Sequence, residues 1–125
     1  MNILIDTHIL LWIVKLDKRL KQKHIKLLSS TENNFYFSVA SLAEIMIKVK
    51  TGKLIFDDDI AVVADKVGFK ILDLKPADVL ALKTMSRHHN DPFDRMLISQ
   101  SINRGLPILT YDEKFKLYDC KLIEV

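Results

Sequence analysis

The chain has 125 residues, the usual size of one domain, so we expect a single domain over residues 1–125. Apolar residues make up 49% and charged residues 28%, a balance that excludes a disordered chain and favours a folded core. The formal net charge of +3 is mildly basic and favours a polyanionic partner without establishing one.

Several classes of protein are excluded by features that the sequence lacks. The apolar runs are far shorter than the roughly 20 residues of a membrane span, and MNILIDTHIL has neither a basic leader nor a cleavage site. We therefore expect no membrane segment and a cytoplasmic location. Cys120 is the single cysteine, which excludes an internal disulfide and a CxxC pair, and the three glycines are too scattered for a phosphate-binding loop.

Hydrophobic periodicity and turn residues divide the chain into alternating strands and helices. The predicted strands are residues 2–5, 35–37, 70–74 and 107–110, with 121–125 as a candidate final strand. The predicted helices are residues 7–15, 18–30, about 38–50 with Ser38 or Ser41 as its cap, 60–67, 76–85 and 91–104. This alternation predicts an α/β domain with a central, mainly parallel sheet.

Four carboxylates are predicted to share one crevice. Ligands of an open α/β sheet bind outside the carboxyl ends of its strands. Asp6 directly follows the first strand, and Asp112 comes two residues after the strand that ends at Thr110, so both should lie at that edge. Glu44 and Asp94 lie in the early turns of two helices that start from the same edge.

The chemistry of such a cluster predicts a hard cation. Carboxylate oxygens suit Mg²⁺ or Mn²⁺, whereas zinc and copper sites recruit histidine or cysteine. Clustered carboxylates repel one another, so a cluster of four is tolerable mainly when a cation neutralises it. In phosphodiester hydrolysis, one or two such ions generate the hydroxide, hold the phosphate and stabilise the leaving oxygen. Metal-dependent cleavage of a phosphodiester is the predicted chemistry.

Each of these acids also has an ordinary explanation as part of a helix cap. The candidate caps are Asp6 or Thr7, Ser41 with Glu44, Asp91 with Pro92 and Asp94, and Asp112. Glu44 fits this explanation least, because its apolar neighbours predict a buried helix in which a charge needs a partner. Lys48, four residues further on, is the alternative to a metal ion.

The remaining polar and aromatic residues receive structural interpretations. His88 and His89, next to Asp91, could supply a base or a metal ligand, but loop histidines are commonly solvated, and we interpret both as solvated loop residues. Trp12 and Phe93 are assigned to the core or to a protein interface and not to RNA. The basic run over residues 15–26, with Lys48, Lys50 and Lys53, either follows phosphates or is a solvated face. The other acids are interpreted as surface residues: Asp57, Asp58 and Asp59 at a helix start, and Asp65, Asp73, Asp78 and Asp119.

Four segments carry a resemblance to a known family. They are ILIDTH, SLAEIMIK, HHNDPFDRMLISQSI and ILTYDEKF, and together they extend over essentially the whole chain. In this order they resemble a PIN-domain ribonuclease, in particular the VapC-type toxins of bacterial toxin–antitoxin pairs. The resemblance implies a three-layer PIN-like domain, an endoribonuclease that uses Mg²⁺ or Mn²⁺, a homodimer, and a cognate antitoxin that blocks the site. Such a toxin inhibits translation by cutting tRNA, rRNA or mRNA.

The resemblance also assigns roles to individual residues. The positions that match the family's catalytic, metal-binding acids are Asp6, Glu44, Asp94 and Asp112. Asp94 is preferred to Asp91 because the family's acid directly precedes an apolar helix, which leaves Asp91 as a cap. The residues expected to support the acids from close by are Thr7, Asp91, Arg95 and Thr110.

Three other functions stay open at this point. One is a non-catalytic, Mg²⁺-binding α/β signalling or binding module, in which Asp73 would mimic a phosphoacceptor. A second is a haloacid-type phosphatase, which would need an aspartate where His8 stands. A third is a toxin-like fold that only binds an antitoxin, against which the presence of all four acids argues.

Overall fold

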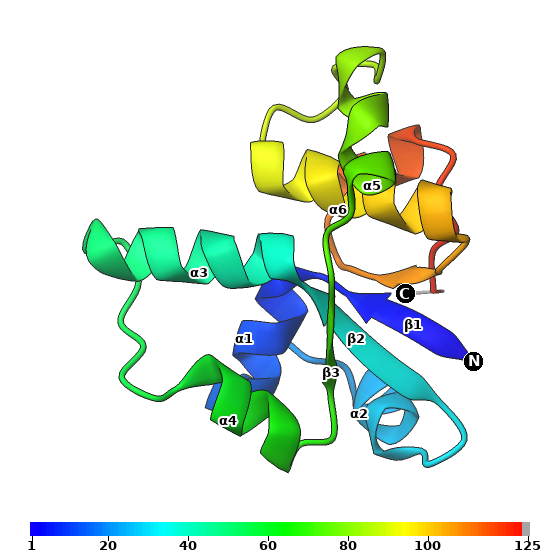
Figure 1. Cartoon of the computed structure of the whole chain (residues 1–125). Helices are drawn as coiled ribbons and strands as arrows, with labels where there is room; N and C mark the ends of the chain where they lie inside the picture. Colours follow the sequence, from blue (N-terminus) through cyan, green and yellow to red (C-terminus); the bar gives the residue numbers. More distant parts are fainter. Residues whose placement is uncertain (124–125) are drawn as a thin grey trace.

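A four-stranded parallel sheet organises the molecule (Figure 1). The structure is a computed structural model and describes residues 1–123. The strands are β1 (Asn2–Ile5), β2 (Asn34–Ser38), β3 (Lys70–Leu72) and β4 (Ile108–Leu109), in the order β3-β2-β1-β4. Every strand pairing is parallel, which confirms the predicted α/β class with a parallel sheet. β1 is central, because Leu4 pairs with both Tyr36 and Ile108.

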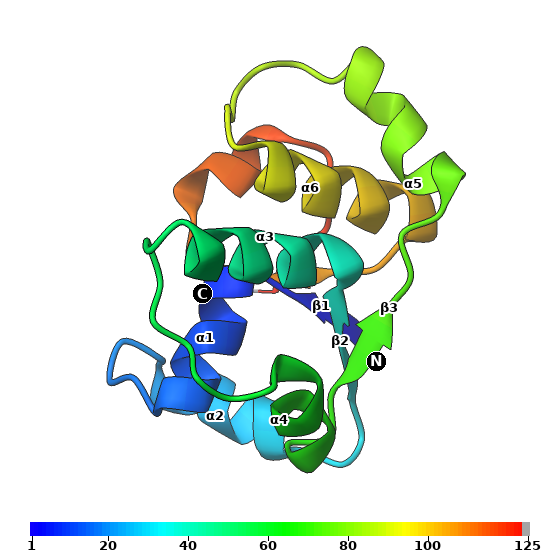
Figure 2. The same cartoon turned by 60° about the vertical axis from the view of Figure 1, so that its left-hand side comes forward.

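Helices cover both faces of this sheet, which makes three layers (Figures 1 and 2). They are α1 (Thr7–Lys15), α2 (Gln22–Ser29), α3 (Val39–Lys50), α4 (Ile60–Lys66), α5 (Pro76–Leu80) and α6 (Pro92–Arg104), with short 3₁₀ helices η1 (Ala81–Lys83) and η2 (Glu113–Leu117). Among the described residues, none of the helices has the length and apolar character that a membrane crossing requires.

The alternation of side chains along β1 creates two hydrophobic cores. Ile3 and Ile5 pack in one cluster with residues of α1, α3 and α4. Leu4 points to the other face and packs with Leu97 of α6 and Phe115 of η2. All three β1 side chains are fully buried, and each such burial stabilises the fold by about 1.5–3 kcal/mol.

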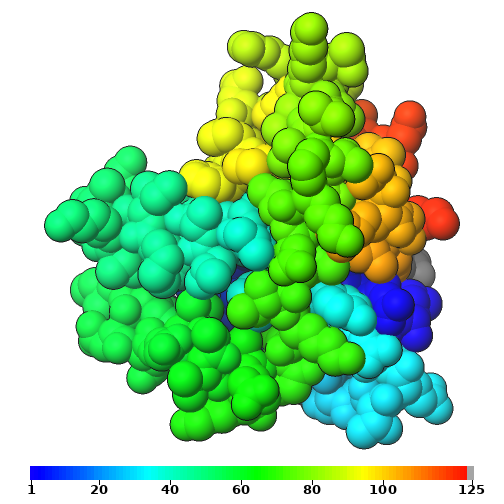
Figure 3. All heavy atoms as spheres, in the orientation of Figure 1, coloured from blue at the N-terminus to red at the C-terminus, as the bar shows by residue number. Residues whose placement is uncertain are grey.

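Two predicted helices are shorter than the sequence pattern indicated. α2 begins at Gln22 instead of residue 18, because Asp17 accepts hydrogen bonds from the backbone and guanidinium of Arg19 and holds a turn there. α5 ends at Leu80, and η1 takes over part of the segment predicted to be helical up to residue 85. In Figure 3 the segment from β3 to η1 forms a ridge across this face, with α3 on one side and the end of α6 on the other.

Caps and turns settle the alternatives at the element ends. Ser38 caps α3, since its hydroxyl accepts from Ala40 N at 3.0 Å, so the capping box of Ser41 with Glu44 is not formed. Gly105 ends α6 at φ 65, a conformation that suits glycine. The candidate strand over 121–125 is reduced in the described residues to one bridge between Leu122 and Ile108, and residues 124–125 lie outside them.

The prediction that Asp78 is a surface residue is wrong. Its side chain is fully buried and receives hydrogen bonds from Arg104 Nε at 3.0 Å and Arg104 Nη2 at 2.7 Å. Asn103 and the Lys75 backbone amide donate to the same carboxylate. The Arg104 guanidinium holds the pKa of Asp78 below its usual value. The ion pair therefore fastens α5 to the end of α6.

We expect Asp78→Ala to lower the free energy of unfolding by about 3 kcal/mol, because it leaves the charge of Arg104 without its buried partner. The contribution of a carboxylate with a lowered pKa is complete above its ordinary pKa of about 4 and is lost as the pH falls through the lowered value. Urea denaturation at pH 7 and pH 3 measures both effects. Asp65→Ala, on the exposed side of α4, is the control, and an equal loss in both variants would contradict the prediction.

Candidate functional site

Asp6 and Asp112 lie at the carboxyl edge of the sheet, after β1 and β4. The Asp6 amide donates to Leu109 O at 3.0 Å, which ties the end of β1 to β4. Thr110 Oγ1 donates to Asp6 Oδ2 at 2.8 Å and accepts from the Asp112 amide at 3.0 Å. One hydroxyl therefore connects both acids, as expected for a residue that supports them.

The cap explanation holds for Asp112 but not for the Asp6 side chain. Asp112 Oδ1 accepts from Lys114 N at 2.9 Å and caps η2. Asp6 precedes α1, yet its carboxylate makes no capping hydrogen bond, and it is only 2% exposed. Asp6 is thus a buried acid whose side chain does not cap α1.

Glu44 lies on α3, which runs beside α6 (Figures 1 and 2). Its side chain is buried, and Lys48 Nζ lies 2.6 Å from Oε2. The predicted pairing with Lys48 is therefore confirmed, but it engages one oxygen only. Oε1 is buried and has no hydrogen-bond partner.

Asp94 lies in the first turn of α6, and Asp91 caps that helix. Asp91 Oδ1 accepts from Phe93 N at 2.8 Å and from Asp94 N at 3.2 Å, which confirms Asp91 as the cap. The Asp94 carboxylate is therefore not needed for capping and lies in the interior, 5% exposed. Its Oδ1 has no hydrogen-bond partner.

His89 is a residue of this cluster that the sequence analysis did not find. The interpretation as a solvated loop residue is wrong, because His89 is 7% exposed and its Nε2 lies 2.9 Å from both Asp94 Oδ2 and Asp112 Oδ2. Its Nδ1 accepts from the Asp91 amide at 3.2 Å. This assigns the proton to Nε2, so the ring donates between two carboxylates. Ligand atoms of these three residues all lie within 4.8 Å of one another.

Electrostatic interaction connects the four predicted acids. Burial, followed by the charges of Asp6, Asp91, Glu44 and Asp112, raises the pKa of Asp94 to about 8. Burial also raises the pKa of Asp6, while the hydrogen bond from Thr110 and the neighbouring His8 act in the opposite direction, and the charge of Glu44 raises it slightly further. The structure thus brings the other three predicted acids within electrostatic range of Asp94, and places Asp112 and His89 next to it.

This donor set fits a hard divalent cation. In the part of the chain that the structure describes, four buried side-chain atoms lack a hydrogen-bond partner, and three of them are Asp6 Oδ1, Glu44 Oε1 and Asp94 Oδ1. Buried carboxylates normally have partners, since an unpaired charge in the interior is costly. Oxygen ligands of this kind are those that Mg²⁺ and Mn²⁺ prefer.

Arg95 and Thr7, which were expected to support the acids, form no hydrogen bond with the four acids among the described contacts. Arg95 Nη1 donates to the carbonyls of Ser86 at 2.9 Å and His89 at 3.2 Å, and Nη2 donates to Met85 O at 3.2 Å. Arg95 therefore shapes the loop that carries His89. Thr7 Oγ1 donates to Ser41 Oγ at 2.8 Å and connects α1 to α3.

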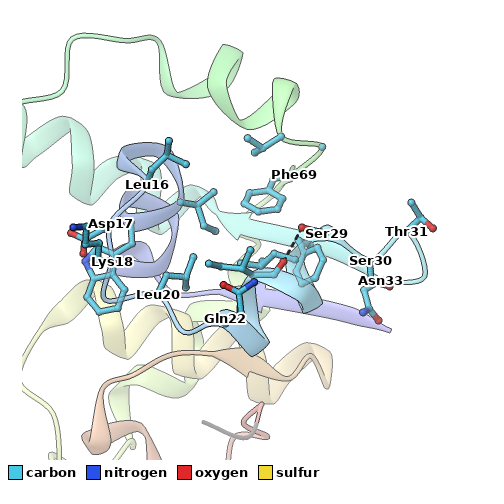
Figure 4. Close-up of a pocket in the computed structure, with 17 residues that line it drawn as sticks. Leu16, Asp17, Lys18, Leu20, Gln22, Ser29, Ser30, Thr31, Asn33 and Phe69 are labelled. Carbon is cyan, nitrogen blue, oxygen red and sulfur yellow. Dashed lines mark hydrogen bonds between the residues drawn. The ribbon is translucent and has the colours of Figure 1, made fainter.

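A separate, larger hollow lies away from this cluster (Figure 4). It has a volume of about 790 Å³, and the apolar side chains that border it include Leu16, Leu20 and Phe69. The described residues that line it do not include any of the four acids. Its described lining is more apolar than polar and includes none of the four acids, so it is poorly suited to chemistry on a phosphate.

Fold and site together define an α/β domain with an acidic pocket at the carboxyl edge of a parallel sheet. The model of the PIN domain family matches residues 3–120. The chain therefore belongs to the PIN domain family, as its sequence segments indicated. No curated protein matches the chain in sequence.

Solved structures share this fold along their whole length. One such structure is VapBC2 from Rickettsia felis, bound to a DNA fragment from the VapBC2 promoter. The matched chain is 17% identical to this one, 98% of each chain is covered, and the TM-score is 0.66. DNA-bound VapBC from Salmonella typhimurium is 16% identical, covers 98% of this chain and 97% of that one, and has a TM-score of 0.68. VapBC-1 from nontypeable Haemophilus influenzae is 16% identical, with 99% and 98% covered and a TM-score of 0.69.

We expect Mn²⁺ or Mg²⁺ to raise the thermal unfolding midpoint, because a cation that binds only the folded state stabilises it. Without metal, Asp94→Asn should stabilise the protein at pH 8 by about 1–3 kcal/mol, because it removes a buried charge that lacks full hydrogen bonding. The raised pKa of Asp94 fixes the sign: its destabilising effect grows as the pH rises from about 4 to about 8.

Calorimetry of both proteins with EDTA and with MnCl₂ measures these effects. Asp73→Asn, which removes an exposed acid after β3, is the matched control and should keep the wild-type response to metal. A metal-induced increase of the same size in Asp94→Asn and in the wild type would rule out Asp94 as a ligand.

Proposed function

We propose that this chain is a Mg²⁺- or Mn²⁺-dependent endoribonuclease of the VapC type and acts as the toxin of a toxin–antitoxin pair. Membership of the PIN domain family supports the nuclease class, since such domains are typically nucleases. The likeness of the fold to VapBC proteins supports the toxin assignment. The observation that carries the proposal is the set of buried, unpartnered oxygens on Asp6, Glu44 and Asp94.

In this function the four acids hold the cation. Asp6, Asp94 and Glu44 offer the oxygens that lack hydrogen bonds, and Asp112 offers a partly exposed carboxylate beside Asp94. When bound, the ion supplies a hydroxide nucleophile and stabilises the charge that develops on the phosphate. The half-exposed position of Asp112 leaves one side of the cluster open to an RNA backbone.

The neighbours of the acids orient them for this role. Thr110 fixes the rotamer of Asp6 by its 2.8 Å hydrogen bond. Lys48 occupies one oxygen of Glu44 and leaves the other for the ion. His89 holds Asp94 and Asp112 at a common distance of 2.9 Å from its Nε2. Because the proton is on Nε2, we assign His89 to positioning and not to metal ligation.

The proposed biological setting follows the family. The substrate is cellular RNA in the cytoplasm, and cleavage of tRNA, rRNA or mRNA inhibits translation. The chain pairs as a homodimer and binds a cognate antitoxin. The apolar hollow of about 790 Å³ and the exposed Leu16 beside it offer a surface that a protein partner would cover.

We expect the purified chain to cleave total RNA in Mn²⁺ or Mg²⁺ and not in EDTA. Asp6→Asn and Asp94→Asn should each reduce cleavage by about a hundredfold or more, because loss of an acid that holds the ion removes several kcal/mol of transition-state stabilisation. Gel analysis of fluorescent RNA measures the rate. The control is Asp73→Asn, and wild-type activity in the two site variants would refute the assignment.

A second experiment tests His89. We expect His89→Leu to reduce cleavage by about 10–100-fold, the usual cost of losing a group that orients a metal ligand. Arg95 and Tyr118 hydrogen-bond the backbone of this loop, so the variant removes the side chain without freeing the loop. The exposed neighbour provides the control His88→Leu, which should retain activity. Equal rates for the two variants would show that the bridge between the acids is dispensable.

A further inference from the structure

A small hollow adjoins the acid cluster and borders the larger apolar one, with which it shares Trp12. Its volume is about 200 Å³, and it is lined by Asp6, His8, Ile9, Trp12, Tyr111 and Asp112. Pockets for drug-sized ligands have volumes of about 300–1,000 Å³, so this one suits a smaller, flat group. Two of its lining residues are candidate acids, which puts any occupant directly beside the predicted chemistry.

The aromatic residues of the hollow are held in fixed positions. Tyr111 Oη accepts from the Lys21 amide at 2.9 Å and lies 2.6 Å from Nδ1 of the buried His24. The ring centroids of Trp12 and Tyr111 are 5.3 Å apart, with an angle of 55° between the planes. Tyr111 also stands between Thr110 and Asp112 in the chain, so the ring and this acid lie on the same short segment.

Cations border the same rings. Arg19 Cζ lies 4.7 Å from the centroid of Trp12, and Lys21 Nζ lies 5.5 Å from that of Tyr111. Arg19 is neutralised by Asp17 at 2.7 Å, whereas no salt bridge of the described residues involves Lys21. A positive charge thus lies outside the hollow and negative carboxylates lie within it.

The charges around the small hollow determine which part of a nucleotide can occupy it. A phosphate at the inner end of the hollow would lie beside the cation that Asp6 and Asp112 are proposed to hold, and one at the rim would be attracted by Lys21. Aromatic rings bind bases by stacking, which tolerates any sequence. We infer that the hollow formed by Trp12, Tyr111 and His8 binds one unpaired base of the RNA substrate and thereby sets the position of the neighbouring phosphate, which revises the sequence-based assignment of Trp12 to the core or a protein interface.

The inference rests on the proposed ribonuclease activity. It can be tested by the intrinsic fluorescence of Trp12. Trp12 is the single tryptophan, so the fluorescence of the chain reports on the surroundings of Trp12, which lines this hollow and also borders the larger one. The experiment uses the Asp94→Asn chain with Mg²⁺, which keeps RNA intact, and titrates it with short oligoadenylate. An abasic ribose-phosphate oligomer of equal length tests the phosphates alone. We expect saturable quenching by oligoadenylate and none by the abasic oligomer.

A substitution series separates stacking from packing. In the Asp94→Asn background, Tyr111→Leu should weaken oligoadenylate binding about tenfold, equivalent to about 1.4 kcal/mol. Tyr111→Phe keeps the ring, loses both hydroxyl contacts and should bind as the parent does. Tyr36→Leu, which changes a half-buried tyrosine of β2 away from the hollow, is the matched control. Thermal unfolding checks that each variant is folded.

The outcomes separate this inference from the proposed function. If the wild-type chain cleaves RNA but oligoadenylate leaves Trp12 fluorescence unchanged, or if Tyr111→Leu binds as the parent does, the base-binding hollow is refuted and the nuclease stands. If oligoadenylate quenches Trp12 and the wild-type chain cleaves no RNA in Mn²⁺ or Mg²⁺, the hollow is supported and the nuclease is refuted.

Discussion

Mutual repulsion among buried carboxylates is the main physical constraint on the arrangement of the acid cluster. Asp6, Glu44 and Asp94 are nearly inaccessible to water, and each keeps one oxygen without a hydrogen bond. Their neighbours satisfy the other oxygens: Thr110, Lys48 and His89. The fold thus stabilises one oxygen of each acid and leaves the other oxygen without a hydrogen bond. A protein selected for stability alone would not bury three acids in this way.

The sheet order explains how residues so distant in sequence meet. β1 lies between β2 and β4, so the carboxyl ends of the first and last strands are neighbours. α3 and α6 lie side by side, and each brings one acid to the cluster. The loop before α6 then closes the cluster through His89. Its shape depends on Arg95 and Tyr118, whose hydrogen bonds go to backbone atoms of that loop.

The sequence predicts what depends on strand ends and local periodicity. Asp6 and Asp112 follow strands of a parallel sheet, so their shared edge could be predicted, and the apolar neighbours of Glu44 indicated its burial. Asp78 was misjudged because its partner Arg104 is distant in the chain, and His89 was misjudged because one of its two partners, Asp112, is distant as well. One contact of His89 is local in sequence, because its ring accepts a hydrogen bond from the amide of Asp91, two residues later.

The hydroxyl of Thr110 couples the two ends of the chain, and this has a consequence for synthesis. It donates to Asp6 and accepts from the amide of Asp112, so the cluster is complete only when β4 has docked beside β1. Chains emerge from the ribosome N-terminus first. A growing chain that has not reached Asp112 lacks the fourth acid of the cluster, even when it already contains Asp6, Glu44 and Asp94. Synthesis through β4 and Asp112 is therefore needed before the four acids can meet.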